Sequence, residues 1–194
     1  MNSKIKKIRL PVELKQLQKN SSEHGITCAF ADSNDNSSHL IANIPGPKGS
    51  PYEDGIFKVS IVLGSQYPFQ PPTFKFMSSI YHPNIDNSGK ICLDLLRMPP
   101  TGSYNPAITL ESMLLSIQLL LSSPNPDDPL NGEAADLFKT SREQFNIKAR
   151  ELIPKNCLNA EESDKETATD TTQDVSNKCD DTVVGPASKR NKPC

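Results

Sequence analysis

Aromatic residues are scarce and unevenly placed in this chain of 194 residues. It has no tryptophan, and none of its four tyrosines and seven phenylalanines lies beyond Phe145. Residues 156–194 are rich in Asp, Glu, Thr, Ser and Asn, with 5 basic against 8 acidic side chains. Such a segment cannot bury enough apolar surface to offset the entropy lost on ordering. We therefore predict one folded domain over residues 1–155 and a disordered polar, acidic tail over residues 156–194.

Long apolar runs and an excess of charge of one sign are also missing. No run approaches the ~20 residues that span a bilayer, and the basic N-terminus lacks the apolar segment of a secretory signal. Residues 1–155 hold 16 basic and 15 acidic side chains, so they have no bulk attraction for nucleic acid or anionic lipid. We expect neither a nucleic acid nor a membrane as a direct partner.

Paired cysteines are absent as well. The five cysteines are irregularly spaced, no CxxC occurs, and there are only three histidines. An odd number of cysteines without a secretory signal indicates reduced thiols, hence a protein of the nucleus or cytoplasm. Because zinc sites need three or four Cys or His ligands, usually in close pairs, we predict no metal site.

The pattern that is present begins with short strands. Residues 26–30, 40–44, 55–63 and 73–77 are apolar or alternate with a period of two, and turn residues separate them. Short connections between such segments predict a four-stranded antiparallel meander.

Apolar residues recur at helical spacing both before and after these strands in the sequence. We expect an N-terminal helix that begins near Leu10, because Pro11 fits best in a first turn, with an apolar stripe that includes Ile8 and Val12. Residues 109–121 repeat apolar side chains at i, i+3, i+4 and i+7, which predicts a buried central helix.

Two further helices are expected toward the C-terminal side. The first covers residues 131–139. The second begins at a capping box, Ser141-Arg-Glu-Gln, and would turn Phe145, Ala149 and Leu152 inward.

No regular period appears between Ser78 and Ala107, and so long an irregular stretch in a compact domain is usually functional. It contains "HPNIDNSGKICLD", residues 82–94. A papain-like hydrolase would pair the cysteine with a histidine, but a histidine followed by proline is typical of a rigid structural element. Cys92 could also be an ordinary core residue, because a lone cysteine is most often simply buried.

A thiol acyl carrier is the third interpretation of the same stretch. A thiol is both a good nucleophile and a good leaving group, and a carrier benefits when no strong base lies beside it. Transfer to an amine needs a donor for the oxyanion and a carboxylate that orients or deprotonates the amine. Asn84 and the pair Asp127–Asp128 are candidates, although each also fits an ordinary turn.

Three segments resemble the ubiquitin-conjugating (E2) enzymes. "YHPNIDNSGKICLDLL" looks like the active-site signature of that family, and "SPYEDGIFKVSIVLGSQYPFQPPTFKF" like its strand-and-loop segment. "LLSIQLLLSSPNPDDPLNGEAADLF" is similar to its central helix and gate loop. The resemblance covers about residues 5–155. It implies an α+β ubiquitin-conjugating (UBC) fold, with a four-stranded antiparallel meander flanked by an N-terminal helix and C-terminal helices.

The resemblance also implies roles for residues of the site. Cys92 would carry the C-terminal glycine of ubiquitin as a thioester, and Asn84 would stabilise the oxyanion, order the loop, or both. Asp128 would position the substrate lysine and help remove its proton. Supporting positions would be His82, which holds the loop, Asp94 beside the cysteine, Asp127 and Tyr104.

The family's docking face for a RING-type ligase and the activating enzyme would use Lys6, Lys7, Arg9, Phe69, Pro106 and Ala107. The chain departs from the family at Tyr104, where a tryptophan is usual. The loop "RMPPTGSYNP" is also longer than in the commonest members. This loop, together with "GITC", is similar to the T-type members of the Fanconi anaemia DNA-repair pathway, which implies that pathway's RING ligase and mainly monoubiquitination.

The implied reaction passes ubiquitin from Cys92 to a lysine of a protein substrate. ATP would be used by the upstream activating enzyme, and this chain would need no cofactor of its own. Two alternatives stay open: conjugation of a ubiquitin-like modifier such as SUMO or NEDD8, and a non-catalytic ubiquitin-binding variant. Such variants lack the cysteine, so Cys92 argues against the second.

Overall fold

The computed structural model describes residues 2–32 and 38–153. Helix α1 (Asn2–His24) leads into one antiparallel sheet, in which the strands lie in chain order. These strands are β1 (Thr27–Phe30), β2 (His39–Pro45), β3 (Ile56–Val62) and β4 (Thr73–Phe76). They are followed by a one-turn 3-10 helix η1 (Asp94–Leu96), then α2 (Leu110–Ser122), α3 (Gly132–Thr140) and α4 (Arg142–Glu151). The predicted α+β fold, a four-stranded meander between N- and C-terminal helices, is confirmed.

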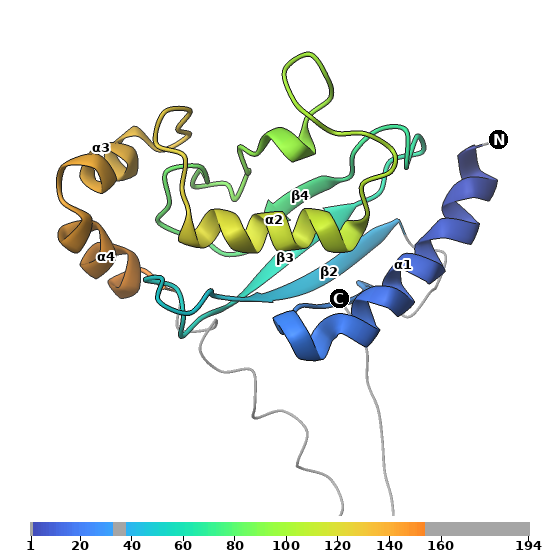
Figure 1. Cartoon of the computed structure of the whole chain (residues 1–194), viewed down its shortest axis with the longest axis horizontal. Helices are drawn as coiled ribbons and strands as arrows, with labels where there is room; N and C mark the ends of the chain where they lie inside the picture. The colour runs from blue at the N-terminus through green and yellow to red at the C-terminus, as the bar shows by residue number, and fades with distance from the viewer. Residues whose placement is uncertain (1, 33–37, 154–194) are drawn as a thin grey trace, which may run out of the picture. The chain divides into compact units, whose positions relative to one another are not determined.

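The core lies between the sheet and helix α2, which runs across it (Figure 1). Strands β2 and β3 bury alternate side chains, as the period of two predicts, and Ala42 pairs with Val59 at the centre of their ladder. Helix α2 supplies the opposite wall with its buried residues Leu110, Met113, Leu114, Ile117, Leu120 and Leu121. The buried central helix is therefore confirmed.

Helix α1 differs from the prediction at its start. It begins at Asn2 rather than near Leu10, and Pro11 lies inside it. A proline there removes one helical hydrogen bond, but tertiary contacts hold the turn, because Leu10 is buried and the Arg9 guanidinium donates to the carbonyl of Ile108 at 2.7 Å. The expected apolar stripe is wrong in part, since Ile8 and Val12 are exposed.

Helices α3 and α4 begin where the sequence predicts, within one residue, but two details are wrong. The hydroxyl of Ser141 makes no capping bond to α4, so the expected capping box does not form. Phe145 and Ala149 are buried as predicted, whereas Leu152 is half exposed because the helix ends at Glu151, before this side chain can turn inward.

The predicted tail, residues 156–194, lies outside the described residues. Within residues 2–32 and 38–153, no helix combines the length and the apolar character needed to cross a membrane.

Candidate active site

Residues 78–107 have little regular structure, as predicted. Apart from η1, the segment contains isolated bridges that pair Ile85 with His82 and with Ile91. Ile85 is fully buried and Ile91 nearly so, which anchors the turn between them. Side-chain hydrogen bonds then fix the remaining backbone.

His82 is a buried structural imidazole. Its Nε2 donates to the carbonyl of Leu120 at 2.9 Å, and its Nδ1 accepts the backbone N–H of Asn84 at 3.0 Å. These two bonds require the neutral ring with the proton on Nε2. Burial lowers the pKa of His82 to about 4, against a smaller opposing effect of the Leu120 carbonyl. Because both nitrogens are occupied, this ring cannot form an ion pair with Cys92, and the hydrolase interpretation fails.

Asn84 is buried, and its carboxamide is fully used by the loop that follows α2. Its Nδ2 donates to the carbonyls of Asn125, at 2.7 Å, and Asp128, at 3.0 Å. Its Oδ1 accepts the backbone N–H of Asn125 at 2.8 Å. Both amide hydrogens therefore have partners, and neither is free for an oxyanion in this conformation.

The backbone around Asn84 completes the connection. The Pro83 carbonyl accepts the N–H groups of Leu130 and Asn131, just before α3, and the Asn84 carbonyl accepts the N–H of Cys92 at 2.8 Å. Residues 82–84 thus fix the position of Cys92 relative to the ends of α2 and α3.

Cys92 lies half-buried in a small cleft of about 90 Å³. Its Sγ–H donates to Oδ2 of Asp128 at 3.2 Å. Burial and the Asp128 carboxylate raise the pKa of the Cys92 thiol, while Arg97 acts in the opposite direction. The cleft is lined by Asn84, Cys92, Leu93, Asp94, Arg97, Leu120, Asn125 and Asp128.

Arg97 is the site residue that the sequence analysis missed. Its Nη2 donates to Oδ1 of Asp94 and, at 3.2 Å, to Oδ2 of Asp128. A basic residue five positions after the cysteine is the only sequence signal for it, and nothing local predicts contact with residue 128. Hydrogen bonds from Cys92 and Arg97 lower the pKa of Asp128.

The two neighbouring acids after α2 have different surroundings. Asp128 faces Cys92 and Arg97, whereas Asp127 pairs with Lys139 at 2.8 Å and does not line the cleft. Of this adjacent pair, the structure brings only Asp128 to the cysteine, and Asp94 also lines the cleft, as expected. No group of three His, Cys, Asp or Glu side chains in the described part of the chain could hold a metal ion.

Most residues of the expected docking face lie exposed on neighbouring segments. Phe69, Pro106 and Ala107 are exposed, and the Arg9 guanidinium donates to the Pro106 carbonyl, which joins α1 to this loop. Tyr104 is buried instead, and its hydroxyl donates to the Pro68 carbonyl at 2.6 Å. Tyr104 therefore ties together the two loops that carry Phe69 and Pro106.

Two lysines were also expected on this face. Lys7 is exposed, whereas the Lys6 ammonium donates to the Ser38 hydroxyl at 2.6 Å. Lys6 thus already has a partner within the chain.

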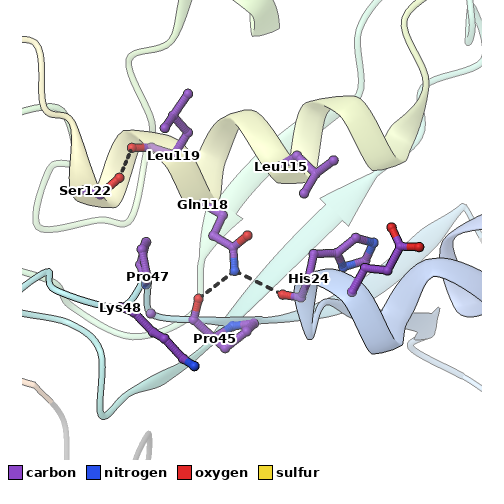
Figure 2. A pocket seen from close by; sticks show the side chains of 10 residues that line it. His24, Pro45, Pro47, Lys48, Leu115, Gln118, Leu119 and Ser122 are labelled. Carbon is purple, nitrogen blue, oxygen red and sulfur yellow. Dashed lines mark hydrogen bonds between the residues drawn. The ribbon is translucent and has the colours of Figure 1, made fainter.

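A wider groove of about 700 Å³ lies beside the end of α1, the residues after β2 and one face of α2 (Figure 2). The Gln118 amide bridges its walls by donating to the carbonyls of Pro45, at 3.0 Å, and His24, at 3.3 Å. Leu115 and Leu119 are exposed at its edge. No cysteine is among the residues that line this groove, whereas Cys92 lines the smaller cleft.

Known proteins resemble this chain in sequence and in fold. The family profile described as "Ubiquitin-conjugating enzyme" matches residues 9–153. Ubiquitin-conjugating enzyme E2 T of Xenopus laevis is 42% identical over 189 residues, 96% of each chain, and that of Homo sapiens is 43% identical over 73% of this chain and 71% of its own. The E2 domain of a Toxoplasma gondii ubiquitin conjugating enzyme superposes with a TM-score of 0.66 at 34% identity, covering 75% of this chain and 94% of that domain.

Proposed function

The chain belongs to the ubiquitin-conjugating enzyme family, and we propose that within it Cys92 is the ubiquitin carrier. The thiol of Cys92 would displace the thiol of the activating enzyme from the C-terminal carbonyl of ubiquitin, forming a new thioester. A substrate lysine amine would then attack that carbonyl. The C–N bond forms, the C–S bond breaks, sulfur leaves as the Cys92 thiolate, and the amine proton passes to the thiolate or to solvent.

The observation that carries this proposal is the contact between the Cys92 thiol and the Asp128 carboxylate in a cleft without a free imidazole. A strong base beside the sulfur would activate water and hydrolyse the thioester. A carboxylate of low pKa is a poor base for water, yet its oxygen can accept a hydrogen bond from a lysine amine and so orient it. The cleft therefore suits a carrier that waits for an amine.

We infer that Asn84 acts by ordering the loop rather than by binding the oxyanion directly. Its three hydrogen bonds hold residues 125–128 in place, and those bonds position Asp128 beside Cys92. A role at the oxyanion would require one amide hydrogen to leave its carbonyl partner during the reaction.

The exposed surface formed by Phe69, Pro106 and Ala107 together with α1 would receive the activating enzyme and a RING-type ligase. Tyr104 and Arg9 support this role because each fixes one of the contributing loops. ATP would be consumed by the activating enzyme, and neither nucleotide nor metal would bind this chain. The assignment to monoubiquitination in Fanconi anaemia DNA repair, in the nucleus or cytoplasm, rests on the resemblance of residues 97–106 and "GITC" to T-type members.

A charging assay tests the proposal. The protein is mixed with ubiquitin, its activating enzyme and ATP, and gels are run with and without reductant. We expect a reductant-sensitive band about one ubiquitin heavier in wild type and in Cys28→Ser, and none in Cys92→Ser. Cys28 is the matched control because burial raises the pKa of its thiol to about 12. Charging by SUMO or NEDD8 instead of ubiquitin, or a reductant-sensitive band that survives in Cys92→Ser, would refute the proposal.

A further inference from the structure

Arg97 holds an unusual position beside the nucleophile. One nitrogen, Nη2, contacts Asp94 on its own segment and Asp128 on the loop after α2. The Asp128 oxygen that accepts this bond, Oδ2, is the same atom that accepts the Cys92 thiol, with both contacts at 3.2 Å. Thiol, carboxylate and guanidinium therefore meet at one oxygen.

The ion pairs of Arg97 contribute little to the stability of the fold. Asp94 and Asp128 are mostly exposed, 70% and 60% by side chain, and ion pairs at such exposed positions contribute little. The Nε–H of Arg97 is buried with no hydrogen-bond partner in the described part of the chain, which is unfavourable for folding. The position of the guanidinium is thus better explained by the chemistry next to it.

The longer loop after η1 builds the platform for this side chain. The Asp94 carbonyl accepts the N–H groups of Arg97 and Ser103, at 3.0 and 2.9 Å, and the Arg97 carbonyl accepts the N–H of Tyr104 at 3.0 Å. The loop closes against Arg97 at Gly102, where an added Cβ would lie 2.2 Å from the Arg97 carbonyl oxygen and 2.4 Å from its Cβ. Only glycine permits this closure, so the loop restrains the backbone from which the guanidinium projects.

The charges around the cleft define what Arg97 can do. Its guanidinium faces the Asp94 and Asp128 carboxylates and the Cys92 thiol, and the neighbouring Asp127 is matched separately by Lys139. Without Arg97, Asp94 and Asp128 would be two uncompensated negative charges beside the sulfur. Such a field stabilises a lysine as its ammonium ion, which cannot attack a carbonyl.

We propose that Arg97 is a positioning residue of the transfer step, which holds the Asp128 carboxylate at Cys92 and presents a positive charge that favours the neutral, attacking form of the substrate amine. The inference rests on the proposed function of Cys92. It predicts an effect on attack by lysine and little effect on charging, because charging involves no amine.

Single-turnover discharge tests the proposal. Wild type, Arg97→Gln, Arg97→Lys and Lys139→Gln are charged with ubiquitin, the charging enzyme is quenched, and discharge to free lysine is followed from pH 6.5 to 9.5. We expect Arg97→Gln to discharge about tenfold more slowly at pH 7, with the midpoint of its pH–rate profile moved up by about one unit. Arg97→Lys retains the charge and should keep the wild-type midpoint. Lys139→Gln, which removes the cation from the adjacent acid, should match wild type.

Hydroxylamine provides the readout that a purely structural role would not give. This amine is already neutral at pH 7, so its reaction with the charged Arg97→Gln variant should be slowed far less than that of lysine. Equal slowing of both amines without a shift of the midpoint, or a wild-type profile for Arg97→Gln, would overturn the proposal. Failure of wild type to charge would instead refute the carrier function, and thermal melts of each variant identify any that do not fold.

Discussion

The sheet with helix α2 and the segment around residues 82–97 are built by different forces. In the first, the contacts are apolar, and side chains such as Ala42, Val59 and Leu114 are completely buried. In the second, buried polar groups set the geometry: His82 and Asn84 are fully buried, and the side chain of each donates to backbone carbonyls on a distant segment. The hydrophobic effect is not directional, whereas hydrogen bonds are. The first region therefore supplies most of the stability, and the second fixes the position of Cys92.

The strongest way to separate the two regions is to remove apolar volume from the core. Leu114 is fully buried in α2 but does not line the Cys92 cleft. We expect Leu114→Ala to lower the free energy of unfolding by about 2–5 kcal/mol, measured by urea denaturation, while the folded protein charges at the wild-type rate. Leu119→Ala is the matched control, because the same change on the same helix occurs at a side chain that is 63% exposed and should cost less than about 0.5 kcal/mol. A charging defect in Leu114→Ala below its unfolding transition would show that the regions are not separable.

The contrast also explains what could be predicted from the sequence. Strands β2 and β3 and helix α2 follow from periodicity, because one face of each is buried in the same core. The start of α1 could not be predicted, since contacts from Arg9 to residues 106 and 108 stabilise a helix that local propensity would interrupt at Pro11. Resemblance to a family pointed to Cys92 and Asp128, which meet in the structure.

Arg97 could not be predicted for a related reason. Its proposed role depends on contact with a carboxylate 31 positions away in the chain, and no periodic pattern records such a distance. The same holds for the different partners of Asp127 and Asp128, which are adjacent in sequence but face different cations. Local pattern thus predicts the apolar region well and the polar region poorly.

A second, smaller effect on the free energy of unfolding should appear when the pH is lowered, because His82 lies in the polar region. In the unfolded chain the imidazole of His82 binds a proton below about pH 6.5, whereas burial holds it neutral in the folded protein down to about pH 4. The unfolded state then binds more protons, so stability is complete above pH 6.5 and falls as the pH drops toward 4, by about 3 kcal/mol from this group. Urea denaturation of wild type and His82→Gln at several pH values from 7 to 4 measures it. Glutamine can still donate to the Leu120 carbonyl but does not titrate. The slope of stability against pH should therefore be smaller in His82→Gln, by the equivalent of about one bound proton.

The other histidines do not confuse this comparison, because His24 and His39 are present in both proteins. Parallel pH curves for wild type and His82→Gln would mean that the His82 ring gains its proton as easily in the folded state as in the unfolded one. The polar region would then be more open to solvent than its buried position implies.

The smallest effect tests whether these two regions account for the stability by themselves. If residues 156–194 form a polar tail outside a catalytic core of residues 1–155, a chain ending at residue 155 should match the full chain within about 0.5 kcal/mol in urea denaturation and should charge equally well. A chain ending at Ser141 is the informative contrast, because it also loses α4, whose Phe145 and Ala149 are buried, and it should be strongly destabilised. A loss of several kcal/mol at residue 155 would mean that the tail covers apolar surface of the body, and that the core described above is only part of what holds the sheet and α2 together.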